Sequence, residues 1–347
     1  MFRMSLDPVA DPRWRALVEA HPSSVFQSPA WLGVLRDTYD LDIRADVLVD
    51  EGGDPVAGMA YAELHDMMDP RIVSLPFSDF CDPVVGTAEE WEALIGPLLA
   101  KGCQLSLRCL HAQFPRRDAR FQNTNQAKWH AVDLQREPEE IWASLHPSAR
   151  RSIRKARSSG VTVRKADTRD DLRAFFELHL KLRKYKYRLL AQPYRFFENI
   201  WDAFIEPGHG VLLLARVNDE IVGGVLFLEW RETLYYKFNA SSASHLELRP
   251  NDAVICEGID HGRQRGLRYL DFGLSDSQQE GLVRYKRKYA TDEKEIQFLQ
   301  HSPQGLPTES DAIMRSRLPL LTELFVDETV PDEITERAGD VLYSFFA

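Results

Sequence analysis

The sequence predicts an α/β protein built from two related domains, each with a mixed central sheet. Its 347 residues exceed the size of most single domains. Helical and strand patterns alternate along the chain, and both halves show the same order of elements. Hydrophobic residues make up 44% and charged residues 28%, which is typical of a globular protein with a packed core.

The first half begins with two helical patterns and continues into a pair of strands. Ser28 can cap the second helix, and Pro29 suits its first turn because that position needs no backbone N–H donor. A glycine-containing turn at 50–54 joins the strands. We expect, in order, a helix ending at Ala20, a helix from Pro29 through Leu35, strands Ala45–Val49 and Pro55–Glu63, helix Thr87–Ala100, and strands Gln104–Leu110 and Trp129–Leu134.

The second half repeats this plan. Asn218 and Asp219 form a polar turn between two apolar strands, and Pro250 fits the first turn of a long helix. We expect helices Thr168–Tyr187 and Pro193–Phe204, strands Val211–Val217, Ile221–Trp230 and Thr233–Ala240, helix Pro250–Arg265, strand Arg268–Phe272, a strand near Glu295–Phe298, and closing helices near Ile313–Phe325 and Ile334–Phe346.

A short internal echo supports a duplicated unit. Residues 48–61 and 215–227 both read as an apolar strand, an acidic turn, a small residue with glycine, and a second strand. We assign residues 1–140 to an N-terminal domain, 141–305 to a C-terminal domain and 306–347 to a helical tail. The tail contains an apolar run from Leu318 to Phe325, and we expect the body of the protein to cover it.

Composition and missing motifs exclude several classes of protein. No stretch approaches the roughly 20 apolar residues that span a bilayer, and the N-terminus lacks the apolar core of a secretory signal. The four cysteines form no C-x-x-C pair and are expected to be reduced thiols in a cytoplasmic protein. Histidine spacing predicts no metal site. Motifs of hydrolases, metalloproteases, P-loop NTPases and dinucleotide-binding enzymes are missing.

One basic segment stands out in an acidic chain. The net charge is −10, yet residues 146–195 contain 15 Lys and Arg against 4 Asp and Glu. Such a local excess favours a site for an anionic ligand over a general affinity for DNA. A solvated helix pair held by salt bridges would produce the same composition, and that alternative stays open.

Six segments, in the right order, resemble the Fem-type (FemABX) peptidyl-aminoacyl transferases of the GNAT-like superfamily. They are the opening helix Phe26–Trp31, a central loop Leu75–Phe80, a basic helix Ala149–Ala156 followed by Gly160, a helix start at Leu248–Ala253, the strand Tyr269–Gly273, and the segment Glu280–Lys286. The resemblance covers about residues 24 to 300.

The resemblance implies a fold and a reaction. The fold would be a tandem pair of GNAT-like (acyl-CoA N-acyltransferase-like) domains, with the C-terminal helices packing back. The reaction would move an aminoacyl group from charged tRNA to an amine of a peptide or nucleotide-linked acceptor, in peptidoglycan or exopolysaccharide biosynthesis, without a bound cofactor. Two alternatives remain: acyl-CoA as donor to a polysaccharide precursor or secondary metabolite, and an RNA-binding protein without enzymatic activity.

The candidate catalytic and acceptor-binding residues come from the same segments. Lys286 matches a lysine implicated in transfer, with Tyr285 beside it, and a lysine can stabilise negative charge on a carbonyl oxygen. The resemblance implies substrate contacts for Arg36, Asp79 and Tyr236. Tyr236 points away from its strand neighbours Tyr235 and Lys237 if side chains alternate. The expected helix at 168–187 places Arg183 and Lys186 three residues apart on one face, where they could bind phosphate.

The candidate donor-binding residues lie on two helices. Asn251 and Asp252 follow Pro250, where free N–H groups in a GNAT fold hold a pyrophosphate. Here the glycine-rich loop of such sites is missing and Asp252 adds a negative charge, which argues against acyl-CoA. Arg151 and Arg154 share one face of the basic helix and are expected to contact the donor.

Overall fold

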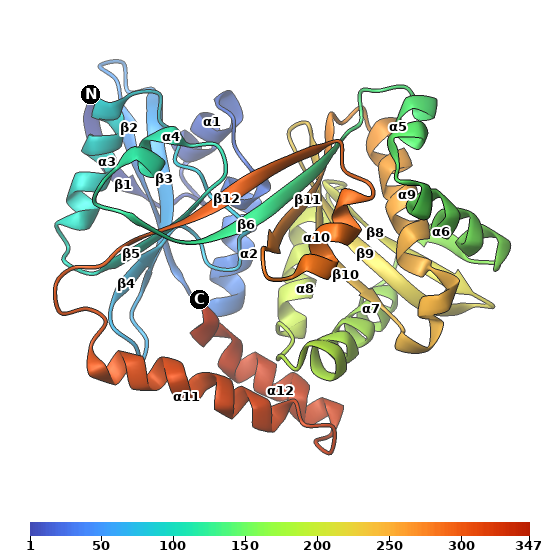
Figure 1. The fold of residues 1–347 in the computed structure, drawn as a ribbon. Coiled ribbons are helices and arrows are strands. Elements are labelled where there is room, and N and C mark those ends of the chain that lie inside the picture. Colours follow the sequence, from blue (N-terminus) through green and yellow to red (C-terminus); the bar gives the residue numbers. More distant parts are fainter. The chain divides into compact units, whose positions relative to one another are not determined.

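The computed structural model describes residues 1–347, which divide into two compact units (Figure 1). Unit 1 contains residues 1–127, 295–321 and 344–347, and unit 2 contains residues 128–294 and 322–343. Strands β6 (Gln122–Asp133) and β12 (Asp292–His301) both run from one unit into the other. The chain therefore changes units inside strands, whereas the sequence places the domain limits after residues 140 and 305.

Unit 1 is a mixed sheet with helices. Its strand order is β1 (Phe2–Leu6), β2 (Asp42–Val49), β3 (Pro55–Leu64), β4 (Arg71–Val73), β5 (Gln104–Cys109) and β12, and only β4 and β5 pair in parallel. Its helices are α1 (Pro12–Ala20), α2 (Pro29–Tyr39), α3 (Ala88–Leu99) and α4 (Gln113–Arg117). As expected, Ser28 caps α2, and its Oγ accepts the Trp31 N–H at 3.2 Å.

Unit 2 repeats this architecture on a second mixed sheet. From β6 the strand order is β11 (Tyr269–Asp276), β10 (Thr233–Ser241), β9 (Glu220–Trp230), β8 (Gly210–Val217) and β7 (Thr162–Lys165). The helices are α5 (Pro138–Ser144), α6 (Pro147–Ser158), α7 (Arg169–Lys181), α8 (Tyr194–Ile200), α9 (Pro250–Gln264), α10 (Glu280–Arg287) and α12 (Asp332–Leu342). The β8–β9 hairpin of unit 2 corresponds to the β2–β3 hairpin of unit 1, as the internal echo predicts.

Helix α9 packs closely on the sheet of unit 2. Gly258 makes this possible, because an added Cβ would lie 2.6 Å from Cζ of Phe227 on β9. Apolar side chains of α9, including Val254 and Ile255, are fully buried against the sheet. Burial of this kind fixes the position of the first turn of α9, which lies next to the candidate site described below.

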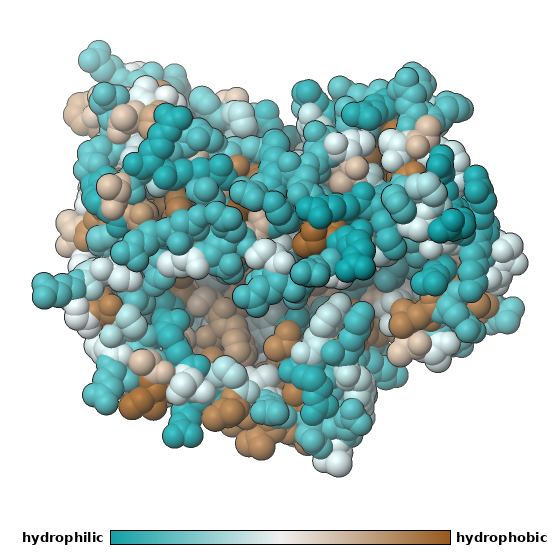
Figure 2. Space-filling view, in the orientation of Figure 1, coloured by the Kyte–Doolittle hydropathy of each residue, from teal (hydrophilic) through white to brown (hydrophobic).

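The closing helices only partly behave as expected. The expectation that the apolar run of α11 (Glu309–Phe325) is covered is wrong for most of its members, since Leu320 is 53% and Leu324 68% exposed, while Leu318 and Phe325 are half-buried. Figure 2 shows hydrophobic residues along this edge of the molecule. The buried side chains near the two ends of α11 are instead the polar Asp311 and Thr322. No helix is long and apolar enough to cross a bilayer.

Helix α12 packs within unit 2 by polar contacts that the sequence does not suggest. Lys184 is fully buried, and its Nζ donates to Val330 O and to Asp332 Oδ1. Arg173 forms a two-pronged ion pair with Glu336 at 2.7 and 2.8 Å. The prediction that the tail packs back therefore holds for α12, and cations of the basic segment hold it there.

Candidate functional site

The strands β10 and β11 separate after the first three residues of each. They pair in parallel at Thr233, Leu234 and Tyr235 of β10, and the pairing ends there although both strands continue. On its other side β10 has a bulge between Tyr236 and Phe238, which breaks the alternation expected for Tyr235 to Lys237. Diverging carboxyl ends of parallel strands are a frequent ligand site in α/β proteins, because backbone groups there lack strand partners.

The first turn of α9 lies at this opening. It begins at Pro250 after Arg249, whose backbone is left-handed (φ 62°), and a 3₁₀ turn at Ala243–Leu248 precedes it in place of a glycine-rich loop. Asn251 Nδ2 donates to Ser241 Oγ at the end of β10 at 3.3 Å. The other amide atom, Asn251 Oδ1, is buried and has no hydrogen-bond partner.

Asp252 is a buried carboxylate without a cationic partner. It is 5% exposed, and its Oδ1 accepts a hydrogen bond from the hydroxyl of Tyr289. Burial raises the pKa of Asp252, because the charged form is poorly solvated there. The carboxylate also occupies the first helical turn, where the helix dipole favours negative charge.

Lys286 lies on α10 and is 5% exposed, so its ammonium does not point into bulk solvent. Its Nζ donates to Leu274 O at 2.8 Å and to Gly273 O at 3.3 Å, both on β11 beyond the last pair with β10. Gly273 has a positive φ of 65°, and its N–H donates to Asp271 Oδ1 at 2.6 Å. The left-handed glycine and the ammonium together shape β11 where the strands diverge.

A series of neighbouring aromatic side chains begins at Tyr289, whose hydroxyl contacts the carboxylate of Asp252. The rings of Tyr285 and Tyr289 lie 5.6 Å apart, and Tyr289 lies 6.1 Å from Phe272. Phe272 in turn lies 5.5 Å from Tyr236. Burial raises the pKa of Tyr236, Tyr285 and Tyr289, so their hydroxyl groups stay protonated at neutral pH and can donate hydrogen bonds.

Four of the predicted residues thus gather around the opening with Lys286: Tyr236, Asn251, Asp252 and Tyr285. Sequence reasoning missed three others. Tyr289 follows Tyr285 by one helical turn, a spacing that could have identified it. Ser275 is fully buried with an unpartnered hydroxyl, and Gly273 has its positive φ. The burial of the Ser275 hydroxyl and the positive φ of Gly273 cannot be read from the sequence alone.

Arg183 and Lys186 do not form the predicted phosphate-binding face. Helix α7 ends at Lys181, and a π-helical turn follows at Leu182–Tyr187, so the α-helical spacing that supported the pair does not apply. Arg183 Nε donates to Leu190 O at 2.9 Å, which stabilises the local loop. Lys186 Nζ lies 5.2 Å from the ring of Tyr187 on the surface.

Arg151 and Arg154 lie on the exposed face of α6, as the spacing predicts. Helix α6 buries Ala149, Ile153 and Ala156, and it contains five cations and no acidic residue. The guanidinium of Arg154 lies 5.5 Å from the ring of Trp142. Helix α6 contacts α9, so this cationic face belongs to the same unit as the opening.

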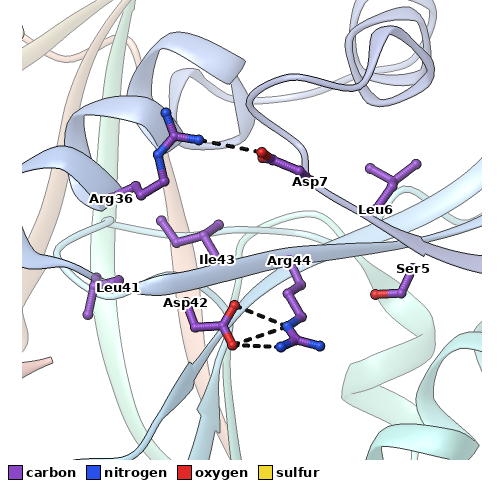
Figure 3. Close-up of a pocket in the computed structure, with 8 residues that line it drawn as sticks. All are labelled: Ser5, Leu6, Asp7, Arg36, Leu41, Asp42, Ile43 and Arg44. Atoms are coloured by element: carbon purple, nitrogen blue, oxygen red, sulfur yellow. Dashed lines mark hydrogen bonds and ion pairs between the residues drawn. The ribbon is translucent and has the colours of Figure 1, made fainter.

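Arg36 and Asp79 belong to unit 1, whereas the residues of this cluster belong to unit 2. Arg36 lines an open surface pocket of about 450 Å³ together with Asp7, Asp42 and Arg44. Figure 3 shows Arg36 directed at Asp7 and Arg44 at Asp42, so the pocket pairs its cations with its own carboxylates. Asp79 follows a loop in which Leu75 and Phe77 have positive φ values of 69° and 58°.

One family comparison covers the second unit. Residues 144–287 match the family described as "Acetyltransferase (GNAT) domain". This segment contains β10, β11, the first turn of α9 and Lys286. No curated protein matches the sequence.

Solved structures share the fold over most of the chain. FemX has a TM-score of 0.64 at 17% identity, and the alignment covers 86% of this chain and 97% of FemX. L-PGS from Bacillus licheniformis has a TM-score of 0.56 at 14% identity, covering 89% and 96%. A tandem GNAT protein from the clavulanic acid biosynthesis pathway has a TM-score of 0.53 at 14% identity, covering 86% and 97%. The predicted fold, tandem GNAT-like domains with mixed sheets, is confirmed.

Proposed function

We propose that this chain, an acyltransferase with the Fem-type GNAT-like fold, moves an aminoacyl group from charged tRNA to an amine. The observation that carries the proposal is the carboxylate of Asp252 buried in the first turn of α9. A pyrophosphate bound at that helix end would meet a negative charge in a poorly solvated site, and such like charges repel strongly. The site is therefore poorly suited to acyl-CoA.

The surroundings of the site suit a nucleic-acid donor better. Helix α6 exposes arginines and carries no acidic residue, and it packs beside α9. Arginine side chains bind phosphate oxygens with two parallel hydrogen bonds, and a cationic helix face follows a phosphate backbone. We assign Arg151 and Arg154 to the phosphates near the 3′ end of the tRNA.

Lys286 is the candidate group for stabilising the transition state. In the reaction, the acceptor nitrogen attacks the ester carbonyl carbon, the C–N bond forms, and the C–O bond to the ribose breaks. The amine loses a proton, and the ribose oxygen gains one. An ammonium fixed against Leu274 O and Gly273 O is preorganised to stabilise the negative charge that develops on either oxygen. No bound cofactor is needed for this chemistry.

Acyl-CoA remains the second candidate donor. The matched family is described as an acetyltransferase domain, and the opening between β10 and β11 offers unpaired backbone groups to an extended acyl carrier. In this case the acceptor would be a polysaccharide precursor or secondary metabolite. The buried carboxylate of Asp252 argues against this alternative, because it would repel the pyrophosphate of CoA.

A donor assay separates these functions. The purified chain is mixed with tRNA charged by a mixture of labelled amino acids, and with peptide and nucleotide-linked amines as acceptors. We expect label to appear in the acceptor, and RNase treatment of the donor to abolish it. Transfer from acetyl-CoA in the same mixtures, with none from charged tRNA, would reject the proposal in favour of the alternative. Salt-sensitive tRNA binding without any transfer would favour an RNA-binding protein.

A further inference from the structure

A buried carboxylate normally forms an ion pair, and Asp252 forms none, although the nearby charges of Lys288 and Arg249 favour its charged form. Its recorded side-chain partner is the neutral hydroxyl of Tyr289. A charged group removed from water at 5% exposure is costly unless an opposite charge or several hydrogen bonds compensate it. The carboxylate at the opening between β10 and β11 therefore has one neutral hydrogen-bond donor and no ion pair, and the charges of Lys288 and Arg249 act on it without direct contact.

A second acceptor next to Asp252 is also unused. The neighbouring side chain, Asn251, is oriented by its Nδ2 contact to Ser241, and its Oδ1 is buried without a donor. A buried acceptor that lacks a donor costs free energy, so natural proteins rarely keep one without a function. Asn251 Oδ1 thus has no donor within the chain, while the adjacent carboxylate of Asp252 has one, the hydroxyl of Tyr289.

Aromatic rings lie beside the same place, and one of them contacts Asp252 through the hydroxyl of Tyr289. Tyr236, Phe272, Tyr289 and Tyr285 form a connected series with ring centroids 5.5, 6.1 and 5.6 Å apart. The hydroxyl of Tyr285 is buried beside that of Tyr289. Aromatic faces attract cations, and a set of them around a carboxylate is a common arrangement for binding organic ammonium groups.

We infer that Asp252, Asn251 Oδ1 and the rings of Tyr236, Tyr285 and Tyr289 form a binding site for a primary ammonium group. We call this set the ammonium cage. An ammonium has three N–H donors and one positive charge, which matches an unpaired carboxylate oxygen, an unpaired amide oxygen and an aromatic wall. Phosphate or a plain acetyl group offers none of these.

This inference rests on the proposed function for the identity of the ligand. An aminoacyl ester has a free α-ammonium next to its reactive carbonyl, whereas an acetyl thioester does not. The cage would thus select aminoacyl donors over simple acyl donors. The acceptor also has an amine, so the same chemistry could come from the acceptor, and the experiment must separate these two sources.

The experiment uses stable mimics of the donor end. Adenosine carrying an aminoacyl group through a 3′-amide is titrated calorimetrically into the full chain, for glycyl, alanyl, seryl, leucyl and lysyl forms. Each mimic is compared with its N-acetyl counterpart, which lacks the α-ammonium. We expect the best free-ammonium mimic to bind about 10- to 100-fold more tightly than its acetylated form. This preference should vanish in Asp252→Asn.

Asp260→Asn is the matched control. Asp260 lies on the same helix two turns later, and burial also raises its pKa. It should keep the full preference for the free ammonium, because it lies outside the cage. A loss of preference in both variants would show a general effect of removing charge from α9 and would overturn the inference.

A second arm tests the cage without any donor. Methylammonium chloride is compared with sodium chloride at equal ionic strength by thermal unfolding of the wild type and both variants. One outcome is that methylammonium stabilises the chain only when Asp252 is present, while the free-ammonium and acetylated donor mimics bind equally well. In that case the cage binds the amine of the acceptor. If the mimics do not bind and no transfer from tRNA occurs, the proposed function is rejected. The methylammonium measurement still shows whether the cage binds an ammonium group. The absence of any Asp252-dependent effect in either arm overturns the inference.

Discussion

Replacing Lys286 by methionine tests the centre of the proposed mechanism. The substitution keeps an unbranched side chain of similar length and removes the ammonium that donates to Leu274 O and Gly273 O. Removing one preorganised donor to a developing oxyanion lowers kcat by about 100- to 1,000-fold. We expect a loss of this size with little change in the affinity for tRNA.

The same substitution should cost only moderate stability. Two buried carbonyl oxygens lose a donor, at about 1–3 kcal/mol each, while the removal of a buried ammonium recovers part of this. A net loss of about 2 kcal/mol corresponds to a Tm lower by about 4–8 °C. The variant should therefore be folded at 25 °C, where single-turnover transfer from charged tRNA can be measured.

Lys184→Met is the matched control. Lys184 is also fully buried and also bonds a backbone carbonyl, but it holds α12 in place. It should lower the urea midpoint by a similar amount and leave the single-turnover rate within about threefold of wild type. A Lys286→Met chain that transfers at the wild-type rate, or equal rate losses in both variants, would refute the role given to Lys286.

Three further predictions concern the tail, the pH dependence and the donor surface. Gly339→Ala should lower the free energy of unfolding by about 1–3 kcal/mol in urea titrations, because its Cβ would lie 2.5 Å from a backbone oxygen. The hydrogen bond from Arg287 lowers the pKa of Glu293 to about 2, so this pair stabilises the fold above pH 4.5 and loses that effect as the pH falls towards 2. Glu293→Gln should hence be less stable at pH 7, with the difference vanishing in acid melts. Arg151→Gln with Arg154→Gln should reduce the salt slope of tRNA binding by about 1.5.

Each of these has a contradicting outcome. A Gly339→Ala chain with an unchanged urea midpoint would show that α12 does not depend on close packing. A stability difference for Glu293→Gln that persists unchanged to pH 2.5 would exclude the ion pair as its source. An unchanged salt slope in the double variant, with folding intact by circular dichroism, would place the tRNA phosphates elsewhere than on α6.

Local chemistry in the sequence predicted much of the architecture. Ser28 and Pro29 predicted the start of α2, and the short echo predicted matching hairpins, β2–β3 and β8–β9. The segments around Pro250 and Lys286 identified residues that the fold brings together. These signals are short-range, since a cap or a turn depends on neighbours only a few residues away.

Features set by distant contacts were not predictable. Lys184 belongs to the basic segment that favours an anionic ligand, but its ammonium pairs with Asp332, which lies 148 positions away in the sequence. A π-helical turn follows Lys181, so the α-helical spacing that was expected to place Arg183 and Lys186 on one face does not apply. Leu320, Leu321 and Leu324 of α11 remain exposed because the face that this helix buries contains Asp311 and Thr322, with Leu318 and Phe325 half-buried beside them.

The buried ammonium of Lys184 also determines where the chain can be shortened. Its counter-charge comes from α12, so a fragment limited to residues 144–287 would lack both groups that accept hydrogen bonds from this ammonium, Val330 O and Asp332 Oδ1. Such a fragment also lacks β6, whose order next to β11 supports the strand that carries Gly273. The smallest autonomous catalytic body must therefore include residues from both sides of the family-matched segment, and the last helix is as much a part of it as the sheet.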